Sequence, residues 1–355
     1  MQKGYFHRVN RLSPTRLWIN NPTPREAEAA IEAGAISCTT NPTYGSKQLG
    51  HPETREETMR LIREAVFVTE DDDRAADLVT QRLVRRILER FDPLFAAKPG
   101  EKGFVSIQGN PFLDEDPDNI VSEARAYRRL GRNFIAKIPV TEAGLAAIER
   151  LVAEDTPIIA TEVMGLPQTI AVCESYQRVA EKSGRHPPFY LTHITGIFDE
   201  YLNSVAREQG VDIPAEYLWQ AGCIVARRQY QLLKERGYPG IMLGGGARDL
   251  HHFTEMVGGE VHVTINWQGT ANRLIEEDPP VVWRMFTPAP PPVVEELLAK
   301  LPDFRRAYLE DGLAVDEFKG FGPVQHFRNS FLKGWCDLRE AIAAVRQTLR
   351  VGTRA

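Results

Sequence analysis

The sequence predicts an α/β fold, a (β/α)8 TIM barrel with an added C-terminal helical segment. Between residue 16 and about residue 276, short apolar runs of strand type alternate with longer helical patterns. Strand and helix repeat about eight times, which indicates a parallel sheet with helical crossovers. This number of units favours a closed barrel over an open doubly wound sheet.

The predicted strands are short runs rich in apolar and β-branched residues, bounded by glycine, proline or polar residues. Because a barrel of this kind buries both faces of its strands, such runs are nearly continuous in apolar residues. The expected strands cover residues 16–20, 36–40, 103–108, 133–138, 157–163, 189–194, 240–244 and 261–266.

Several of the predicted crossover helices carry start signals. Thr23-Pro24 and Asp116-Pro117 place a proline in a first turn, and Thr141 precedes another helical pattern. The expected helices cover residues 24–33, 71–91, 118–129, 142–152, 166–182, 216–234 and 249–256.

The pattern changes after about residue 276, where prolines crowd together and a helical pattern follows. Aromatic residues such as Phe327, Phe331 and Trp335 give this last part apolar surface. We therefore expect it to pack on the barrel or on a second subunit, as in a homodimer. The expected parts are an N-terminal extension (1–15), the barrel (16–277), a proline-rich connection (278–292) and a C-terminal helical tail (293–355).

Composition and charge argue against several classes of partner. A net charge of −5 offers no basic field to nucleic acid or an anionic membrane. The chain has no apolar run long enough to span a bilayer and no signal-peptide pattern at its start, so a cytoplasmic location is expected. The 4 cysteines are scattered without CxxC or histidine pairing, so we expect reduced thiols, no metal site and no cofactor.

Lys137 lies in Asn-Phe-Ile-Ala-Lys-Ile-Pro-Val-Thr, the fourth predicted strand. Such an apolar strand is normally buried, and an amine removed from water has a lowered pKa and becomes a nucleophile toward carbonyls. This run alone allows two interpretations. Lys137 either forms an imine with a substrate, or lies at a strand end with its ammonium in solvent or beside a carboxylate.

Three stretches together resemble the transaldolases and the closely similar fructose-6-phosphate aldolases. Cys38-Thr-Thr-Asn-Pro-Thr is similar to the signature after that family's second strand, and Gly244-Gly-Gly-Ala-Arg-Asp to the turn after its seventh. Residues 134–148 resemble the strand and helix that present its Schiff-base lysine. The resemblance covers roughly residues 16–276. It implies a metal-free barrel enzyme in which Lys137 attacks a ketose carbonyl, splits the carbon chain and holds a three-carbon unit.

The resemblance also implies roles for other residues. Asn41 and Thr40 would bind substrate hydroxyls, and Thr192 would add a further contact to the substrate. Thr161 would help to hold a catalytic water. Arg248 follows a glycine-rich turn ahead of a helix and would bind phosphate. The alternatives are a simple Thr-Asn-Pro turn and a flexible turn with a surface arginine.

The acid/base groups that the resemblance implies are replaced in this chain. Asn20 stands where an aspartate is implied on the first strand, and Gln108 where transaldolases have a glutamate on the third. Ile194 stands where the aldolase branch has a tyrosine. An amide cannot take up and release a proton near neutral pH, so Asn20 and Gln108 are expected to line the catalytic site without titrating.

The implied phosphate site is altered as well. Ile197 stands where an arginine is implied, and Gly246 where the turn carries a serine. A charge-assisted contact to an anion contributes ~1.5–3 kcal/mol, so a sugar phosphate is expected to bind about ten- to a hundredfold worse. A substrate without phosphate, or with its anion held elsewhere, is thereby favoured.

Glu162 and His193 are candidate replacements for the missing acid/base groups, because they lie beside Thr161 and Thr192. Regular alternation would aim both side chains away from the barrel axis, although strand ends often break that rule. The alternative is that they serve as partners for the surrounding helices.

The leading hypothesis is a class I aldolase or transaldolase of altered specificity that acts on a small sugar or ketose through Lys137. One alternative is a catalytically silent barrel that binds a sugar or a partner protein. The other is a Schiff-base enzyme that carries out dehydration or isomerisation. The amide replacements favour the alternatives, whereas Lys137 argues against a silent barrel, because an unused buried amine only lowers stability.

Overall fold

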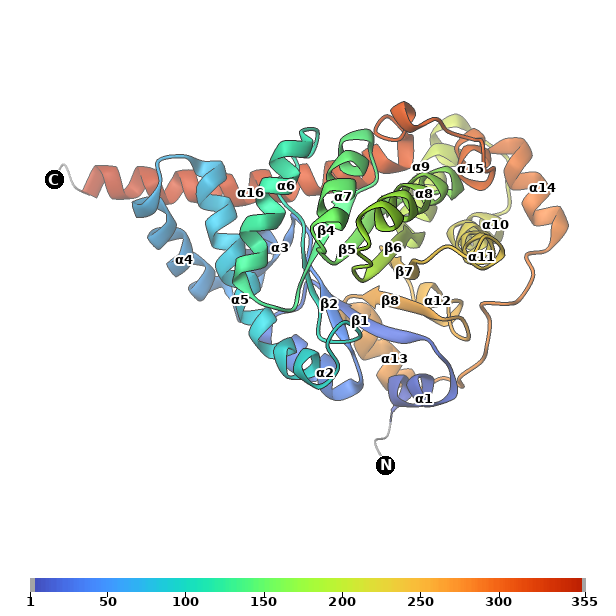
Figure 1. The fold of residues 1–355 in the computed structure, drawn as a ribbon, viewed down its shortest axis with the longest axis horizontal. Helices are drawn as coiled ribbons and strands as arrows, with labels where there is room; N and C mark the ends of the chain where they lie inside the picture. The colour runs from blue at the N-terminus through green and yellow to red at the C-terminus, as the bar shows by residue number, and fades with distance from the viewer. Residues whose placement is uncertain (1–3, 353–355) are drawn as a thin grey trace.

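The structure is a computed structural model that describes residues 4–352 (Figure 1). Within these residues, 8 parallel strands close into a barrel in the order β1 to β8. The predicted (β/α)8 barrel is therefore confirmed, with strand ends that differ from the prediction by one or two residues. The strands are β1 (Arg16–Asn20), β2 (Ser37–Thr39), β3 (Val105–Ile107), β4 (Phe134–Pro139), β5 (Ile158–Val163), β6 (Phe189–Ile194), β7 (Ile241–Gly245) and β8 (Val261–Ile265).

Apolar and aromatic side chains fill the interior of the barrel. Because strand residues alternate between the two faces, the residue two positions later on each strand faces the same interior, nearer the C-terminal mouth. Asn20 thus follows Trp18, and Lys137 follows Ile135. The interior cluster comprises Trp18, Ile36, Phe104, Ile135, Ile159, Tyr190 and Leu243.

The helices outside the barrel begin where the local sequence favours it. They are α1 (Tyr5–Leu12), α2 (Pro24–Ala33), α3 (Tyr44–Gly50), α4 (Arg55–Val68), α5 (Asp72–Ala97), α6 (Pro117–Tyr127), α7 (Glu142–Ala153), α8 (Leu166–Ser183), α9 (Thr195–Gln209), α10 (Ala215–Trp219), α11 (Ala221–Glu235), α12 (His251–Thr254) and α13 (Asn272–Glu277). Thr23 and Glu26 form a capping box at the start of α2, and Thr141 caps α7. The predicted helix 216–234 is broken at Gln220, and the helices α1, α3, α4, α9 and α13 were not predicted. Within residues 4–352, none of the helices combines the length and apolar composition needed to cross a membrane.

The C-terminal part contains α14 (Pro291–Lys300), α15 (Pro302–Tyr308) and the long α16 (Gly322–Gly352). α16, red in Figure 1, packs against α3, α4, α5 and α9. Its aromatic residues Phe331 and Trp335 are buried, and Arg328 forms an ion pair with Asp114 at 2.9 Å. α14 begins inside the predicted proline-rich connection, and residues 1–3 and 353–355 of the predicted end segments lie outside the described residues. The packing of α16 against these helices places it over the C-terminal mouth of the barrel, where Phe327 and Phe331 line the pocket described below.

Candidate active site

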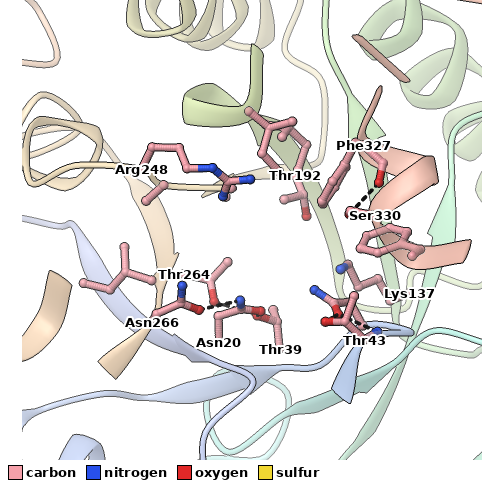
Figure 2. A pocket seen from close by; sticks show the side chains of 18 of the residues that line it. Asn20, Thr39, Thr43, Lys137, Thr192, Arg248, Thr264, Asn266, Phe327 and Ser330 are labelled. Atoms are coloured by element: carbon pink, nitrogen blue, oxygen red, sulfur yellow. Dashed lines mark hydrogen bonds between the residues drawn. The ribbon is translucent and has the colours of Figure 1, made fainter. Parts of the chain in front are cut away.

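A pocket of about 250 Å³ opens at the C-terminal ends of the strands, beneath α16 (Figure 2). Among the described residues that line it, Lys47, Lys137 and Arg248 are cationic and none is a carboxylate. A pocket of this size suits a small ligand, and its position is where barrel enzymes of this type carry their active sites. The other lining residues are Asn20, Thr39, Asn41, Thr43, Thr192, Ile194, Ile197, Gly245, Gly246, Ala247, Thr264, Ile265, Asn266, Phe327, Ser330 and Phe331.

Lys137 is 7% exposed and its amine points into this pocket. Burial lowers its pKa to about 8, although the negative charge of Glu162 opposes the shift, and the positive charge of Lys47 adds to it. Within residues 4–352, the amine forms no hydrogen bond or ion pair, and it lies 5.8 Å from the ring centre of Phe331. The interpretation in which the ammonium pairs with a carboxylate therefore does not describe this lysine, whose amine opens onto the pocket.

Glu162 lies on the inner side of the barrel, contrary to the expectation from regular alternation. A β-bulge separates Ala160 and Val163, and Glu162 has a left-handed backbone with φ of 60°. Its Oε1 accepts a hydrogen bond of 3.0 Å from Nε2 of Gln108. Burial raises the pKa of Glu162 to about 7. The carboxyl group therefore titrates near neutral pH beside the strand that carries Lys137.

Gln168 stabilises this unusual backbone from the first turn of α8. Its Oε1 accepts from the backbone N–H of Met164 at 2.8 Å, and its Nε2 donates to the carbonyls of Val140 and Glu162, both at 3.0 Å. Gln168 is fully buried. The bulge at Glu162 is thus held by side-chain hydrogen bonds, which is typical of strain that serves a site.

Some buried polar atoms near the strand ends have no hydrogen-bond partner within residues 4–352. They include Oε1 of Gln108, Oγ1 of Thr161, Oε2 of Glu162 and Oγ1 of Thr192. Buried polar groups are nearly always hydrogen-bonded to protein or to water. These atoms therefore indicate that water or a bound ligand completes the site.

His193 lies outside the pocket, so the expectation that it replaces a lost acid/base group is not supported. Its Nε2 is 3.1 Å from the carbonyl oxygen of Gly222 on α11. Burial lowers the pKa of His193 to about 4, so the ring stays neutral near pH 7. Regular alternation holds at this position, and the alternative role as a partner for a surrounding helix describes His193 better.

Asn20 belongs to a floor of uncharged hydrogen-bonding groups (Figure 2). Its Nδ2 donates to Oδ1 of Asn266 at 2.9 Å, and its Oδ1 accepts from Thr39 at 3.0 Å. Thr39 also lies 2.6 Å from Oγ1 of Thr264. Thr39 rather than Thr40 faces the pocket, because Thr40 donates to the carbonyl of Ser106 at 2.6 Å. The prediction of Thr40 as a substrate-binding residue was therefore one position out of register.

Asn41 both shapes its turn and lines the pocket. Its Oδ1 accepts from the backbone N–H and the hydroxyl of Thr43, at 3.0 and 2.7 Å. Within the described chain, its amide nitrogen makes no hydrogen bond, so it is free to donate to a ligand. The turn and the binding role are thus compatible in one residue.

The turn after β7 carries Arg248 on the opposite side of the pocket (Figure 2). Nε of Arg248 donates to Glu200 at 2.5 Å, so the arginine is held by a carboxylate outside the pocket. Gly246 has φ of 66°, and a Cβ there would lie 2.7 Å from Ile194 and 3.0 Å from Ile197. The two replaced phosphate-site positions, Gly246 and Ile197, therefore pack against each other.

Lys47 is a cation of the pocket that the sequence did not reveal. It extends from α3, and no hydrogen bond or ion pair holds its side-chain amine within residues 4–352. The surrounding protein lowers its pKa, and the positive charge of Arg248 lowers it further. Lys47 and Arg248 thus bring two positive charges to the same pocket.

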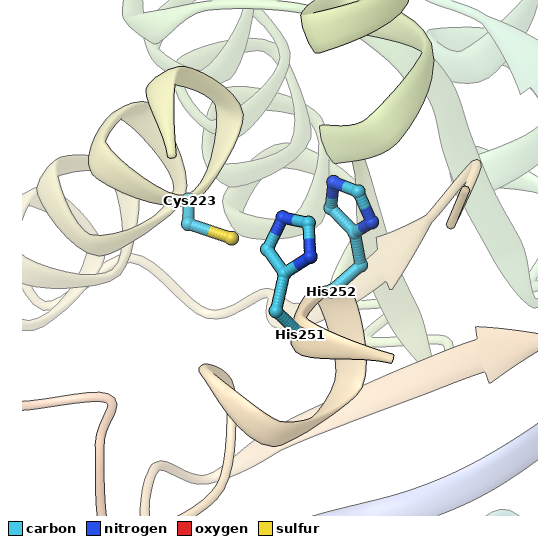
Figure 3. A group of neighbouring side chains, drawn as sticks. All are labelled: Cys223, His251 and His252. Carbon is cyan, nitrogen blue, oxygen red and sulfur yellow. The ribbon is translucent and has the colours of Figure 1, made fainter. Parts of the chain in front are cut away.

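Cys223, His251 and His252 have potential metal-ligand atoms within 4.8 Å of one another (Figure 3). Both ring nitrogens of His252 are engaged, by Asp199 at 2.9 Å and by the backbone N–H groups of Arg248 and Asp249. Nε2 of His251 lies 2.9 Å from the carbonyl of Trp219, whereas its Nδ1 has no hydrogen-bond partner within the described residues. The two histidine rings pack at a centroid distance of 3.8 Å, and burial raises the pKa of the Cys223 thiol. A metal ion would have to break the hydrogen bonds of His252, so we assign the cluster a packing role.

Some pocket residues were not predicted because the sequence contains no local signal for them. Others had a signal that the prediction did not use. Asn266 and Thr264 alternate at the end of the eighth predicted strand, so a period of two would have placed both on the inner face. Nothing in the sequence around Lys47 distinguishes it from a surface lysine. Phe331 was predicted only as part of a packed tail, because its distance from the strands in the sequence conceals their contact.

Comparison with known proteins agrees with this fold. Residues 17–278 match the family model described as Transaldolase/Fructose-6-phosphate aldolase. The transaldolase of Thermobifida fusca (strain YX) is 28% identical over 198 residues, which cover 52% of this chain and 53% of that protein. The transaldolase of Parafrankia sp. (strain EAN1pec) is 31% identical over 160 residues, covering 44% of this chain and 42% of its own. The chain thus spans about half the length of these relatives. The family model covers most of the chain, and the chain therefore belongs to the transaldolase/fructose-6-phosphate aldolase family.

Proposed function

We propose that the protein is a metal-independent Schiff-base aldolase or transaldolase that acts on a ketose phosphate through Lys137. The observation that carries the proposal is a buried amine that faces a small pocket and has no ion pair within residues 4–352. A pKa of about 8 leaves about a quarter of these amines unprotonated at pH 7.5, compared with about one in a thousand for an ordinary lysine. The amine is thus available to attack a carbonyl.

In this proposal, Glu162 replaces the missing acid/base groups. Attack of the Lys137 amine on the ketone gives a carbinolamine, whose hydroxyl must leave as water before the imine forms. Glu162 donates the proton to that hydroxyl, either directly or through a water bound by Thr161 and Gln108. A pKa of about 7 allows Glu162 both to donate a proton and to accept one near neutral pH.

Carbon–carbon cleavage follows from the imine. The base removes the proton of the hydroxyl next to the bond that breaks, the bonding electrons move into the imine, and an aldehyde leaves. The three-carbon enamine stays on Lys137 until it attacks a second aldehyde or is protonated. Phe327 and Phe331 of α16 cover this side of the pocket, and their position supports the exclusion of bulk water.

The cationic pocket supports a phosphorylated substrate. Arg248 and Lys47 line the pocket, and Glu200 holds the arginine by one edge of its guanidinium group. This pair revises the expectation of weak phosphate binding, because Lys47 offers the second positive charge that Ile197 cannot. The amide of Asn41 and the hydroxyl of Thr192 are free to bind the hydroxyls of the sugar.

Reductive trapping tests the proposal. The protein is incubated with fructose 6-phosphate or dihydroxyacetone, reduced with borohydride and digested, and the peptides are analysed by mass spectrometry. A ligand-derived mass increase on Lys137 is expected, and it should be lost in Lys137→Met but kept in Lys333→Met, whose lysine lies exposed on α16. An adduct on other lysines only, or none with any sugar, would refute the proposal.

A Schiff-base reaction without carbon–carbon cleavage is the second candidate. The neutral floor around Asn20 favours it, since Asn20, Thr39 and Asn266 offer no titrating group on that side of the substrate. Product analysis separates the two candidates. Aldolase or transaldolase activity releases or transfers an aldehyde, whereas isomerisation or dehydration leaves the carbon chain intact.

A further inference from the structure

Asp199 and His252 form a buried pair beneath the turn that carries Arg248. Their exposed fractions are 6% and 2%, and Nε2 of His252 lies 2.9 Å from Oδ2 of Asp199. The other oxygen of Asp199 accepts a hydrogen bond of 2.6 Å from the backbone N–H of Gly222. The carboxylate is thus fixed by α11, and it fixes the imidazole in turn.

The hydrogen bonds determine which ring nitrogen of His252 carries the proton. Nδ1 lies 3.2 Å from the backbone nitrogen of Arg248 and 3.1 Å from that of Asp249. Nδ1 also lies 3.3 Å from the carbonyl oxygen of Asp249, to which a protonated Nδ1 could donate. The two backbone N–H groups are closer and can only donate, so together they favour an unprotonated Nδ1 that accepts from both. Nε2 therefore carries the hydrogen and donates it to Asp199. The ring holds two consecutive amides of the turn only in this neutral tautomer.

The start of α9 adds further contacts to the same turn. Thr195 donates from its hydroxyl to the carbonyl of Gly245 at 3.1 Å. A Cβ at Gly196 would lie 2.6 Å from the nitrogen of Arg248 and 2.7 Å from the carbonyl oxygen of Gly246. The turn therefore lies directly on α9, and its backbone has little freedom to shift.

We propose that Asp199 and His252 are positioning residues that hold the Arg248 turn in its anion-binding shape by fixing the tautomer of His252. This inference rests on the proposed function, in which Arg248 binds the substrate phosphate. It assigns the buried histidine a role in phosphate affinity rather than in metal binding or proton transfer. Neither residue lines the pocket around Lys137, so imine formation does not depend on them.

Two substitutions of His252 separate positioning from general packing. In His252→Asn, the amide oxygen can occupy the place of Nδ1 and accept from the turn, whereas His252→Gln places its amide near Nε2 and leaves the turn amides without an acceptor. Inorganic phosphate affinity is measured by calorimetry for both variants. We expect phosphate to bind His252→Asn within about threefold of the unsubstituted protein, and His252→Gln about tenfold more weakly. Equal affinities in the two variants would overturn the inference.

Nitrogen NMR of His252 provides a second readout, which tests the tautomer on which the inference depends. We expect an unprotonated Nδ1 and a protonated Nε2 in the unsubstituted protein; a proton on Nδ1 would overturn the inference. Failure of the proposed function looks different, because phosphate would then bind neither the unsubstituted protein nor Arg248→Ala. Phosphate binding that is lost in Arg248→Ala but unchanged in His252→Gln would refute only the role of His252.

Discussion

Replacing Lys137 with methionine should stabilise the protein in a pH-dependent way. The side chains are similar in length, and within residues 4–352 the amine makes no hydrogen bond that methionine would lose. A buried lysine carries an energetic penalty, because its charged form is disfavoured away from water. Lys137→Met removes this penalty, and the stability gained measures how deeply the amine is buried.

The size of the effect follows from the pKa of Lys137. Its fall from 10.5 to about 8 corresponds to about 3 kcal/mol, at about 1.4 kcal/mol for each tenfold change in proton affinity. Below pH 8, both folded and unfolded chains carry the proton, so the penalty is complete. As the pH rises toward 10.5, the folded protein has already lost the proton, and the penalty disappears. The free energy of unfolding of Lys137→Met at pH 7 should therefore exceed that of the unsubstituted protein by at most about 3 kcal/mol. It is an upper limit, because Glu162 loses its cationic neighbour in the variant. At pH 9.5 the difference should fall to roughly 1 kcal/mol.

Urea unfolding at pH 7, 8.5 and 9.5 tests this prediction through the difference in unfolding free energy between the variant and the unsubstituted protein. Lys333→Met is the matched control, because its lysine is exposed and should change stability by less than about 0.5 kcal/mol at each pH. A Lys137→Met variant that is less stable at pH 7, or whose gain does not depend on pH, would show that the amine is not buried as described.

Three further predictions concern the pocket. Glu162→Gln should lower turnover by about 10²–10⁴-fold and slow borohydride trapping at Lys137, yet the adduct should still form on long incubation, because loss of the negative charge lowers the pKa of Lys137; unchanged turnover would exclude Glu162 as the acid/base group. Lys47→Met should weaken binding of a sugar phosphate about tenfold or more without affecting the free sugar, as measured by calorimetry, and equal losses for both ligands would contradict an anion site. Asn20→Asp should raise aldol cleavage about tenfold or more, with a new dependence on pH, if the missing carboxylate limits the reaction; a pH–rate profile that matches the unsubstituted protein would argue that Glu162 alone suffices.

The barrel could be predicted from the sequence because each strand has a recognisable local pattern of apolar residues. Runs such as 134–139 are apolar throughout, and the alternation that places Ile135 inside also places Lys137 there. Residues that follow this period, such as Asn20 and Thr192, lie where it predicted. The site was thus predictable where a side chain follows the period of a longer strand, but not on the three-residue β2, where Thr39 rather than Thr40 lines the pocket.

The rest depended on tertiary structure. Glu162 turns inward because of a bulge held by Gln168, and alternation alone gives the opposite orientation. Lys47 reaches the pocket from a helix that was not predicted, and its sequence neighbours do not show this. Phe331 closes the pocket from a helix far along the chain. Each of these positions is set by contacts between distant segments, which periodicity does not describe.

The most direct test of the account is the titration of the Lys137 amine itself. The protein is labelled with a trace of acetic anhydride at a series of pH values, and the reaction at Lys137 is quantified by peptide mass spectrometry against Lys333. We expect the reactivity of Lys137 to reach half its maximum near a pH of about 8. A midpoint above about 10, as for a lysine in water, or a lack of reaction throughout, would contradict the claim that a free nucleophilic amine faces the pocket.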